Sequence, residues 1–315
     1  MHKRVKVKAY AVILVGGKGK RLKSISAASC PKAFLPITRT DETMFRKTLD
    51  RARKFIPASR IIVVANKHHA DLVKKDFPDI VGENLVLEPL SRNTAPAIAL
   101  AASLIEKRFT DAIMLVLPSD HHITGESKYA ECLEKGIDFI KRHWREDPLI
   151  VIGIPPRFPA TGFGYIKLQP KGPDAISEDI YGVDGFIEKP ALKIAKTFLK
   201  DGRYLWNSGI FIFRASSILK AVDEFAPAIS MVLGRLGAVR IDALYKRLPN
   251  ISIDYAVMEK ARAIYCVKGS YGWQDIGNPV SLKEVLEKEL EGSGRPSVSM
   301  NILEKLGRIT ARDKR

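Results

Sequence analysis

The sequence predicts an α/β fold whose sheet has parallel strands at its centre, and two observations support this prediction. Short apolar runs rich in β-branched residues recur at 10–15, 60–65 and 111–117. Helix-like segments lie between these runs, at 43–55 and 94–107. Strands that alternate with helices are typical of a parallel-centred sheet covered by helices.

The second half of the chain is richer in strand-like segments and less regular. The expected strands are 149–154, 164–168 and 209–213, and the expected helices are 192–200, 217–224, 254–260 and 280–291. A linker-like stretch rich in glycine follows the last of these helices, and one more short helix is expected within 297–315.

Composition places the chain among ordinary globular proteins. It has 315 residues, of which 46% are hydrophobic and 28% charged. No apolar run reaches the roughly 18 residues of a membrane span, and the N-terminus does not read as a signal peptide. The three cysteines, Cys30, Cys132 and Cys266, are far apart. They are expected to be free thiols in a reducing compartment, which favours a cytoplasmic location.

The net charge of +17 is concentrated near the N-terminus. Residues 1–60 hold 16 Lys and Arg against 3 Asp and Glu. A solvated basic surface, nucleic-acid binding and a pocket for a polyanionic small molecule all fit this charge. Nucleic-acid binding lacks support beyond charge, because the few aromatic residues of this region lie at positions that look structural. No nucleic-acid partner and no membrane partner are expected.

The stretch GGKGKRL at 16–22, with Pro31-Lys32 ten residues on, has the character of a phosphate loop. Glycines let backbone N–H groups approach phosphate oxygens, and the cations neutralise them. Leu22 occupies the third glycine position of a dinucleotide fingerprint, and no Walker A motif can be read here. A basic surface loop after a strand is the alternative.

A second polar segment, LPSDHH at 117–122, follows an expected buried strand. Ligands collect at the carboxyl ends of strands in open α/β sheets, so Asp120 is well placed. A single carboxylate there is often only a turn residue. With Asp275 of GWQDIGN as a partner, it becomes a Mg²⁺ site, whereas the two histidines give little support for zinc.

A third group comprises FIEKP at 186–190 and WNSG at 206–209. Carboxylate and amide side chains near strand ends suit the recognition of hydroxyl and phosphate groups. Each of these segments, taken singly, is also a common polar turn.

Together, these segments resemble one family. The order GGKGKRL, PK, EPLSRNTAPAIALAA, LPSDHHI, TGFGYIK, FIEKP, WNSGIFIFR, SIDYAVMEKA and GWQDIGN is that of bacterial-type mannose-1-phosphate guanylyltransferases, within the sugar-1-phosphate nucleotidyltransferase superfamily. The resemblance covers about residues 9–280, and its most specific parts are 92–102 and 252–261.

The resemblance implies a fold and a domain organisation. The expected fold is a Rossmann-like three-layer α/β/α arrangement with a mixed, mostly parallel central sheet, the nucleotide-diphospho-sugar transferase fold. Residues 1–280 would form the catalytic domain and 281–315 a short C-terminal helical extension. No fused isomerase domain and no full β-helix domain are expected.

It also implies residue roles. Arg21, Lys32, Asp120 and Asp275 would be catalytic, and the two aspartates would bind Mg²⁺. The expected nucleotide-binding residues are Gly16, Gly17, Gly19, Lys20, Arg21, Arg92, Asn93, Thr94 and Ser119. The expected sugar-phosphate-binding residues are Gly164, Glu188, Lys189 and Asn207.

The implied reaction is the Mg²⁺-dependent transfer of a nucleotidyl group from GTP to mannose 1-phosphate, giving GDP-mannose and pyrophosphate. The sugar phosphate would attack the α-phosphorus directly and in line. A sugar phosphate is already anionic at neutral pH, so no general base is required. A homodimer is compatible with the sequence, which does not fix the oligomeric state.

The segment 23–33 departs most from the family pattern and keeps two alternatives open. One is a nucleotidyltransferase for another pair of hexose 1-phosphate and nucleoside triphosphate. The other is a catalytically silent paralogue that binds a nucleotide sugar and regulates a partner.

Overall fold

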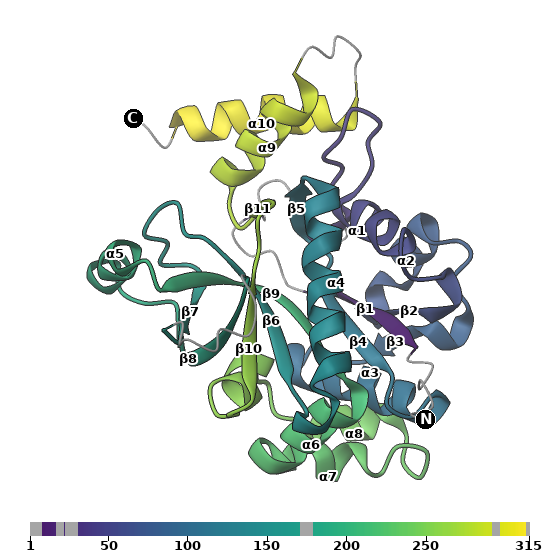
Figure 1. Cartoon of the computed structure of the whole chain (residues 1–315). Coiled ribbons are helices and arrows are strands. Elements are labelled where there is room, and N and C mark those ends of the chain that lie inside the picture. The colour runs from purple at the N-terminus through teal and green to yellow at the C-terminus, as the bar shows by residue number, and fades with distance from the viewer. Residues whose placement is uncertain (1–7, 17–21, 23–30, 171–178, 292–296, 313–315) are drawn as a thin grey trace. The chain divides into compact units, whose positions relative to one another are not determined.

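The computed structural model describes residues 8–16, 22, 31–170, 179–291 and 297–312, with side chains as far as residue 308 (Figure 1). Gly17, Gly19, Lys20, Arg21 and Cys30 therefore lie outside the described residues. The chain forms two compact units. The first comprises Met1–Val12, Glu88–Leu117 and Gly125–Tyr271, and the second Ile13–Leu87, Pro118–Thr124 and Gly272–Arg315.

The first unit contains a mixed sheet. Its strands are β4 (Ile113–Pro118), β6 (Leu149–Ile154), β7 (Gly164–Leu168), β8 (Ile180–Glu188), β9 (Tyr204–Arg214) and β10 (Ile264–Lys268). They follow one another in the order β4-β9-β6-β10-β8-β7. All six residues of β6 are buried, as expected for a strand covered on both faces.

The strand directions of the first unit show a mixed sheet. β10 pairs with β6 in parallel, whereas the pairs β4/β9, β6/β9, β7/β8, β7/β9 and β8/β10 are antiparallel. The mixed sheet is confirmed, but in this unit antiparallel pairs outnumber parallel ones. β7 and β8 are consecutive strands without a helix between them in the described residues, and such strands pair antiparallel.

The first unit also contains helices. They are α3 (Thr94–Arg108), α4 (Glu126–Arg142), α5 (Leu192–Asp201), α6 (Ala215–Phe225), α7 (Pro227–Leu233), α8 (Ile241–Arg247) and a single-turn π-helix, Asp254–Met258. Of these, α4, α5 and α6 contact the sheet, and α4 packs on β9 and β10. α3, α6 and α7 pack against one another. α4 comes so close to the sheet at Gly136 that a Cβ there would lie 2.6 Å from Ile212 Cδ1.

The second unit joins segments that are far apart in the sequence. It contains β2 (Ile61–Asn66), α1 (Met44–Arg53), α2 (Ala70–Asp76), β5 (His121–Thr124), β11 (Gly272–Asp275), α9 (Pro279–Leu290) and α10 (Val298–Arg312), together with most of β3 (Leu85–Glu88) and the last residues of β1 (Ala9–Val15). The strand order is β3-β2-β1, and β5 pairs with β11 in a separate ribbon. α1 begins at a capping residue, Thr43, whose side chain accepts a hydrogen bond from the Arg46 N–H.

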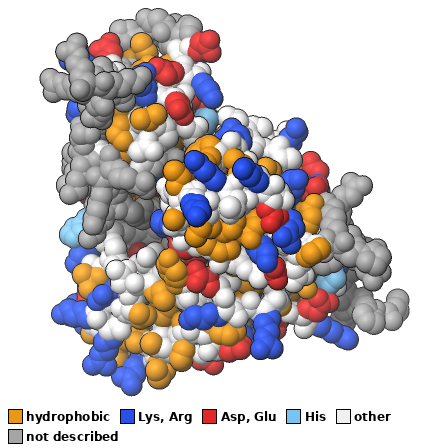
Figure 2. All heavy atoms as spheres, turned by 90° about the vertical axis from the view of Figure 1, so that its left-hand side faces the viewer, with side chains coloured by type: hydrophobic (Ala, Val, Ile, Leu, Met, Phe, Trp, Pro, Cys, Tyr) orange, Lys and Arg blue, Asp and Glu red, His pale blue; other side chains and the backbone are white. Residues whose placement is uncertain are grey.

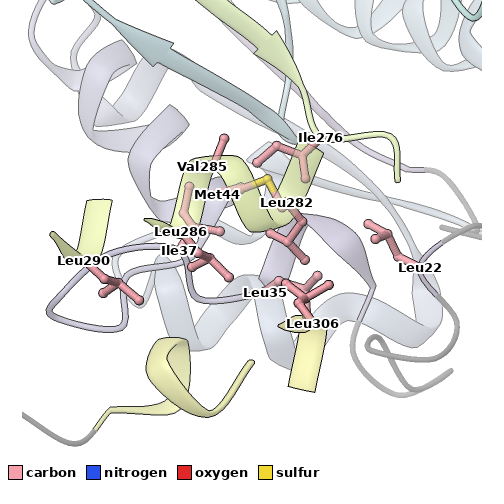
Figure 3. Packing of buried hydrophobic residues seen from close by; sticks show 10 residues of the cluster. All are labelled: Leu22, Leu35, Ile37, Met44, Ile276, Leu282, Val285, Leu286, Leu290 and Leu306. Atoms are coloured by element: carbon pink, nitrogen blue, oxygen red, sulfur yellow. The ribbon is translucent and has the colours of Figure 1, made fainter. Parts of the chain in front are cut away.

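The two C-terminal helices share a hydrophobic core with the segment that carries Lys32 (Figure 3). Leu22 and Leu35 lie on either side of Lys32 in the sequence, and both pack in this core. Its other buried members are Ile37, Met44, Ile276, Leu282, Val285, Leu286, Leu290 and Leu306. The Asp41 carboxylate accepts the backbone N–H groups of Val298 and Ser299 and so caps the start of α10. The predicted domain end at residue 280 stays a prediction, but α9 and α10 pack within the second unit.

The predicted elements agree well with those observed in the apolar stretches. β6 and β7 have the predicted bounds, and β9 is longer than its predicted core. α3 also begins where predicted, at Thr94, and its N-cap is Asn93. Among the described residues, no helix is both long and apolar enough to cross a membrane. Figure 2 shows Lys and Arg side chains interspersed with acidic and hydrophobic ones.

Candidate active site

Lys32 lies between two carboxylates in the second unit. Its Nζ is 2.8 Å from Asp120 Oδ2 and 2.6 Å from Asp275 Oδ1. Lys32 begins a single-turn 3₁₀ helix after Pro31, and the next two residues, Ala33 and Phe34, are buried. This apolar anchor fixes the backbone of Lys32, so that its long side chain reaches the carboxylates from a rigid base.

The ribbon of β5 and β11 explains why two aspartates 155 residues apart meet. In the antiparallel register of this ribbon, Asp275 is the partner of His121, and Asp120 immediately precedes His121. Both carboxylates therefore lie at the same end of the ribbon. The sequence predicted that Asp120 and Asp275 form a pair, and the structure brings them together on Lys32.

The charges of this cluster stabilise one another. Burial disfavours the Lys32 ammonium, but Asp120 and Asp275 outweigh that penalty and raise its pKa. Burial likewise disfavours the charged form of Asp120, and the positive charge of Lys32 nevertheless lowers its pKa. Lys32 is therefore a cation and Asp120 an anion at neutral pH.

His121 supports the ribbon from inside. Its Nδ1 accepts a hydrogen bond from the indole N–H of Trp273 at 3.2 Å, and the two rings meet edge to face. Burial lowers the pKa of His121, although the neighbouring carboxylates oppose this. The imidazole is thus neutral with its proton on Nε2. It holds β5 against β11, a role that the sequence did not reveal.

The two carboxylates fit a magnesium ion. Mg²⁺ in nucleotide-dependent enzymes commonly takes one or two carboxylates and completes its shell with water and substrate phosphates. The side chains of Asp120 and Asp275 are 27% and 25% exposed, so each can reach a bound ion. No cluster of three or more potential ligands from His, Cys, Asp and Glu occurs in the described part of the chain.

Few of the expected nucleotide-binding residues of the second unit can be placed. Gly16 directly follows β1, and a Cβ there would meet no described atom within 4 Å. Ser119 is buried, its N–H donates to the Leu14 carbonyl, and its hydroxyl lacks a hydrogen-bond partner among the described residues. Such a buried hydroxyl next to Asp120 is suited to a ligand.

A second cluster lies in the first unit and contains the four expected sugar-phosphate-binding residues. Gly164 of β7 is the cross-strand partner of Glu188 at the end of β8. A Cβ at Gly164 would lie 2.5 Å from Glu188 Oε2 and 3.5 Å from Asn207 Cβ. The Lys189 ammonium forms an ion pair with the Glu188 carboxylate. Cross-strand pairing thus gathers these residues in one place.

The backbone of Lys189 is unusual. Its φ is +47°, in the left-handed region that non-glycine residues rarely adopt. Its N–H donates to the Phe163 carbonyl, which ties it to the residue before Gly164. Strained residues of this kind are concentrated at functional sites, because surrounding structure must maintain them.

The three other expected nucleotide-binding residues, in the first unit, bond to the protein itself. The guanidinium of Arg92 donates to the carbonyls of Tyr245 and Lys246 in α8. Asn93 has φ +68° and accepts the Thr94 N–H on its side chain. The Thr94 hydroxyl accepts the Ile253 N–H. These contacts support a structural role, and nucleotide binding by these residues stays a prediction.

Sequence reasoning missed one residue of the second cluster. Asp254 accepts a hydrogen bond from Asn207 Nδ2 at 2.7 Å. Burial, and to a lesser degree the charge of Glu188, raises the pKa of Asp254, whereas the Asn207 bond lowers it. The available signal was the carboxylate of Asp254 between Ile253 and the residues Tyr255 to Met258 of SIDYAVMEKA.

The chain matches known proteins over nearly its whole length. The model of the family described as Nucleotidyl transferase matches residues 10–292. The mannose-1-phosphate guanylyltransferase of Sinorhizobium fredii is 36% identical over 298 residues, which cover 91% of this chain and 56% of that protein. ManC, the mannose-1-phosphate guanylyltransferase of Salmonella typhimurium, is 34% identical, with 91% and 61% covered. The chain thus spans about three fifths of the length of these curated relatives.

A solved structure agrees with these matches. The crystal structure named as a mannose-1-phosphate geranyltransferase from Thermus thermophilus is similar with a TM-score of 0.79 at 33% identity. The match covers 89% of this chain and 79% of that chain. A glucose-1-phosphate thymidylyltransferase structure from Bacillus anthracis, named as putative, shares the fold with a TM-score of 0.57 at 18% identity. The predicted sugar-nucleotide transferase fold is therefore confirmed.

Proposed function

Because the chain belongs to the nucleotidyl transferase family, we propose that it transfers a guanylyl group from GTP to mannose 1-phosphate, giving GDP-mannose and pyrophosphate. The names of its relatives in Sinorhizobium fredii and Salmonella typhimurium support this choice of substrates. The observation that carries the proposal is the contact of one buried lysine with two aspartates. The aspartates suit a metal ion, and the lysine suits phosphates.

The proposed reaction requires little acid–base catalysis. The phosphate of the sugar is already anionic, and it attacks the α-phosphorus directly and in line. The protein must hold two polyanions together and stabilise the charge that develops on the phosphorus. Lys32 supplies a cation for this purpose, and its backbone is held in place by the buried residues that follow it. Arg21, Gly17, Gly19 and Lys20 would contribute further cations and N–H groups to the triphosphate.

Asp120 and Asp275 would hold the metal ion, which we propose is Mg²⁺. When bound, the ion neutralises phosphate charge and fixes the geometry of the phosphates. Lys32 pairs with the same two carboxylates and balances their charge. Its ammonium would also be close enough to these metal ligands to contribute a positive charge to a bound phosphate.

The cluster of the first unit would hold the sugar 1-phosphate. The Glu188 carboxylate and the Asn207 amide suit neighbouring sugar hydroxyls. Lys189 offers a cation for the sugar phosphate, and the absence of a side chain at Gly164 leaves room beside Glu188. Ser119 and Gly16 belong to the proposed nucleotide site of the second unit.

A substrate panel tests the proposal. The protein is incubated with each of the four nucleoside triphosphates, a panel of hexose 1-phosphates and Mg²⁺, and pyrophosphate release is measured. Release that is highest with GTP and mannose 1-phosphate is expected. Release with a different pair would show a nucleotidyltransferase of other specificity. Binding of GDP-mannose in calorimetry without turnover of any pair would show a silent paralogue and refute the proposal.

A further inference from the structure

Asp254 stands at the start of the π-helix Asp254–Met258 in the first unit. π-Helical turns are rare and occur often at functional sites. The Asp254 side chain is half-buried, and its Oδ1 accepts the hydrogen bond from Asn207 Nδ2. Asp254 is therefore bonded to a side chain of the proposed sugar site.

This contact fixes the orientation of the Asn207 amide. The Asn207 Oδ1 accepts the backbone N–H of Gly209 at 2.8 Å, while its Nδ2 donates to Asp254. A primary amide has two N–H donors and two lone pairs on oxygen. Both ends of the Asn207 amide are thus held, and beyond these two bonds within the described residues one N–H and one lone pair remain for a ligand.

The position of Asp254 is itself determined by the backbone around it. The Ile253 N–H donates to the Thr94 hydroxyl, and the Ala95 N–H donates to the Ile251 carbonyl. The residues before the π-helix are therefore fastened to the start of α3. These contacts hold the backbone that precedes Asp254.

Glu188 is the other carboxylate of the cluster. Its negative charge acts on Asp254, and Lys189 pairs with Glu188 rather than with Asp254. Among the described residues, the side chains that hydrogen-bond to the Asp254 carboxylate are the Asn207 amide and the Ser252 hydroxyl, and neither of them is a cation. A carboxylate arranged in this way serves to orient a neighbouring amide rather than to balance a charge.

We propose that Asp254 is a positioning residue of the sugar subsite, which aims the Asn207 amide at the hydroxyl groups of the bound sugar 1-phosphate. The proposal rests on the proposed function. Asp254 then contributes to the affinity for the sugar and not to the chemical step or to the binding of nucleotide.

Three variants test this assignment. Asp254→Ala removes the hydrogen-bond acceptor, whereas Asp254→Asn retains an amide oxygen that can accept from Asn207. Glu259→Gln removes a nearby exposed carboxylate that does not bond to Asn207, and it serves as the matched control for charge. The steady-state kinetics of all three are measured with both substrates, and thermal unfolding checks that each variant folds.

Asp254→Ala is expected to raise the KM for mannose 1-phosphate about tenfold, with kcat and the KM for GTP changed less than about twofold. Asp254→Asn should stay within about threefold of the wild-type KM, since its oxygen can still accept the bond. Glu259→Gln should behave as the wild type. A merely structural role would affect kcat, both KM values and the unfolding temperature together.

Two results would overturn the assignment. One is an unchanged KM for mannose 1-phosphate in Asp254→Ala, and the other is an equal loss in Asp254→Asn, which would assign the effect to charge. Failure of the proposed function looks different, because the wild type would then release no pyrophosphate. In that case, calorimetric titration of mannose 1-phosphate into wild type and Asp254→Ala gives the same comparison, and equal affinities contradict the assignment.

Discussion

The ammonium of Lys32 lies 2.6 Å from the Asp275 carboxylate, although 243 residues separate the two in the chain. The same ammonium contacts Asp120, so one cation balances both expected metal ligands. The contact also explains how Lys32 tolerates burial, since an unpaired buried ammonium would lose its proton. The pair links Lys32 to the proposed metal site.

Replacing Lys32 by Ala is expected to lower kcat about 100-fold or more, because a preorganised cation at the phosphates is lost. The KM for mannose 1-phosphate should change much less. Steady-state kinetics with both substrates check this. Lys67→Ala, which removes an exposed lysine of the same unit, is the control and should be neutral. An effect confined to the KM of the sugar phosphate would contradict a role in the chemical step.

Asp120→Asn and Asp275→Asn should each abolish most Mg²⁺-dependent turnover while the fold persists. The amide is a weaker ligand for a hard cation, so residual activity should need at least about tenfold more Mg²⁺. Activity is titrated against MgCl₂ at saturating substrates. Asp79→Asn removes an exposed carboxylate of the same unit and should leave the titration unchanged. A normal titration for either site variant would exclude that residue as a metal ligand.

Gly164→Ala is expected to raise the KM for mannose 1-phosphate, because the new methyl group would lie 2.5 Å from Glu188 Oε2 and displace that carboxylate. The affinity for mannose 1-phosphate should fall about tenfold, which is the effect expected when one hydrogen-bonding group is misplaced. Gly185→Ala is the matched control in the paired strand β8, since no atom of the described residues lies within 4 Å of its Cβ position. Equal behaviour of the two variants would show that space beside Glu188 is unimportant.

Glu88 should make stability depend on pH. Burial raises its pKa from 4.5 to about 7, and a hydrogen bond from the Tyr245 hydroxyl opposes this shift. Below pH 4.5 the carboxyl is protonated in both the folded and unfolded states. As the pH rises from 4.5 to about 7, Glu88 ionises in the unfolded state but stays protonated in the folded state. The free energy of unfolding therefore falls by up to about 3 kcal/mol.

Glu88→Gln keeps an oxygen for the Tyr245 hydroxyl and removes the titration. The variant should therefore gain stability relative to the wild type between about pH 5 and about pH 8. Urea unfolding of both proteins at these two pH values measures the gain. A difference between variant and wild type that is the same at both pH values would contradict the raised pKa.

Local sequence signals were sufficient for the buried parts of the fold. β6 is a continuous apolar run, and the apolar stretch after Asn93 marks α3. α4 was overlooked, although Tyr129, Leu133, Gly136 and Ile140 are buried at helical spacing. The strands β5 and β11 have only four residues each and mix polar with apolar side chains. Such short strands are specified by their partner and not by their own pattern.

Residues of the candidate site could be predicted only where they belong to a recognisable motif. Lys32, Asp120 and Asp275 come from three separate motifs, and their meeting depends on the register of the β5/β11 ribbon. Asp254 escaped prediction because its partner, Asn207, is 47 residues away. The sequence around Asp254 does not indicate its hydrogen bond with Asn207. A π-helix adds one residue to a turn, and helical periodicity does not predict where it occurs.

The fate of the α-phosphorus of GTP tests the central claim most directly. The protein is incubated with mannose 1-phosphate, Mg²⁺ and GTP labelled at either the α- or the γ-phosphorus, and the products are separated. Guanylyl transfer predicts the α-label in GDP-mannose and the γ-label in pyrophosphate. Label from the γ-phosphorus in the sugar product, or α-label that stays out of any nucleotide sugar, would contradict it.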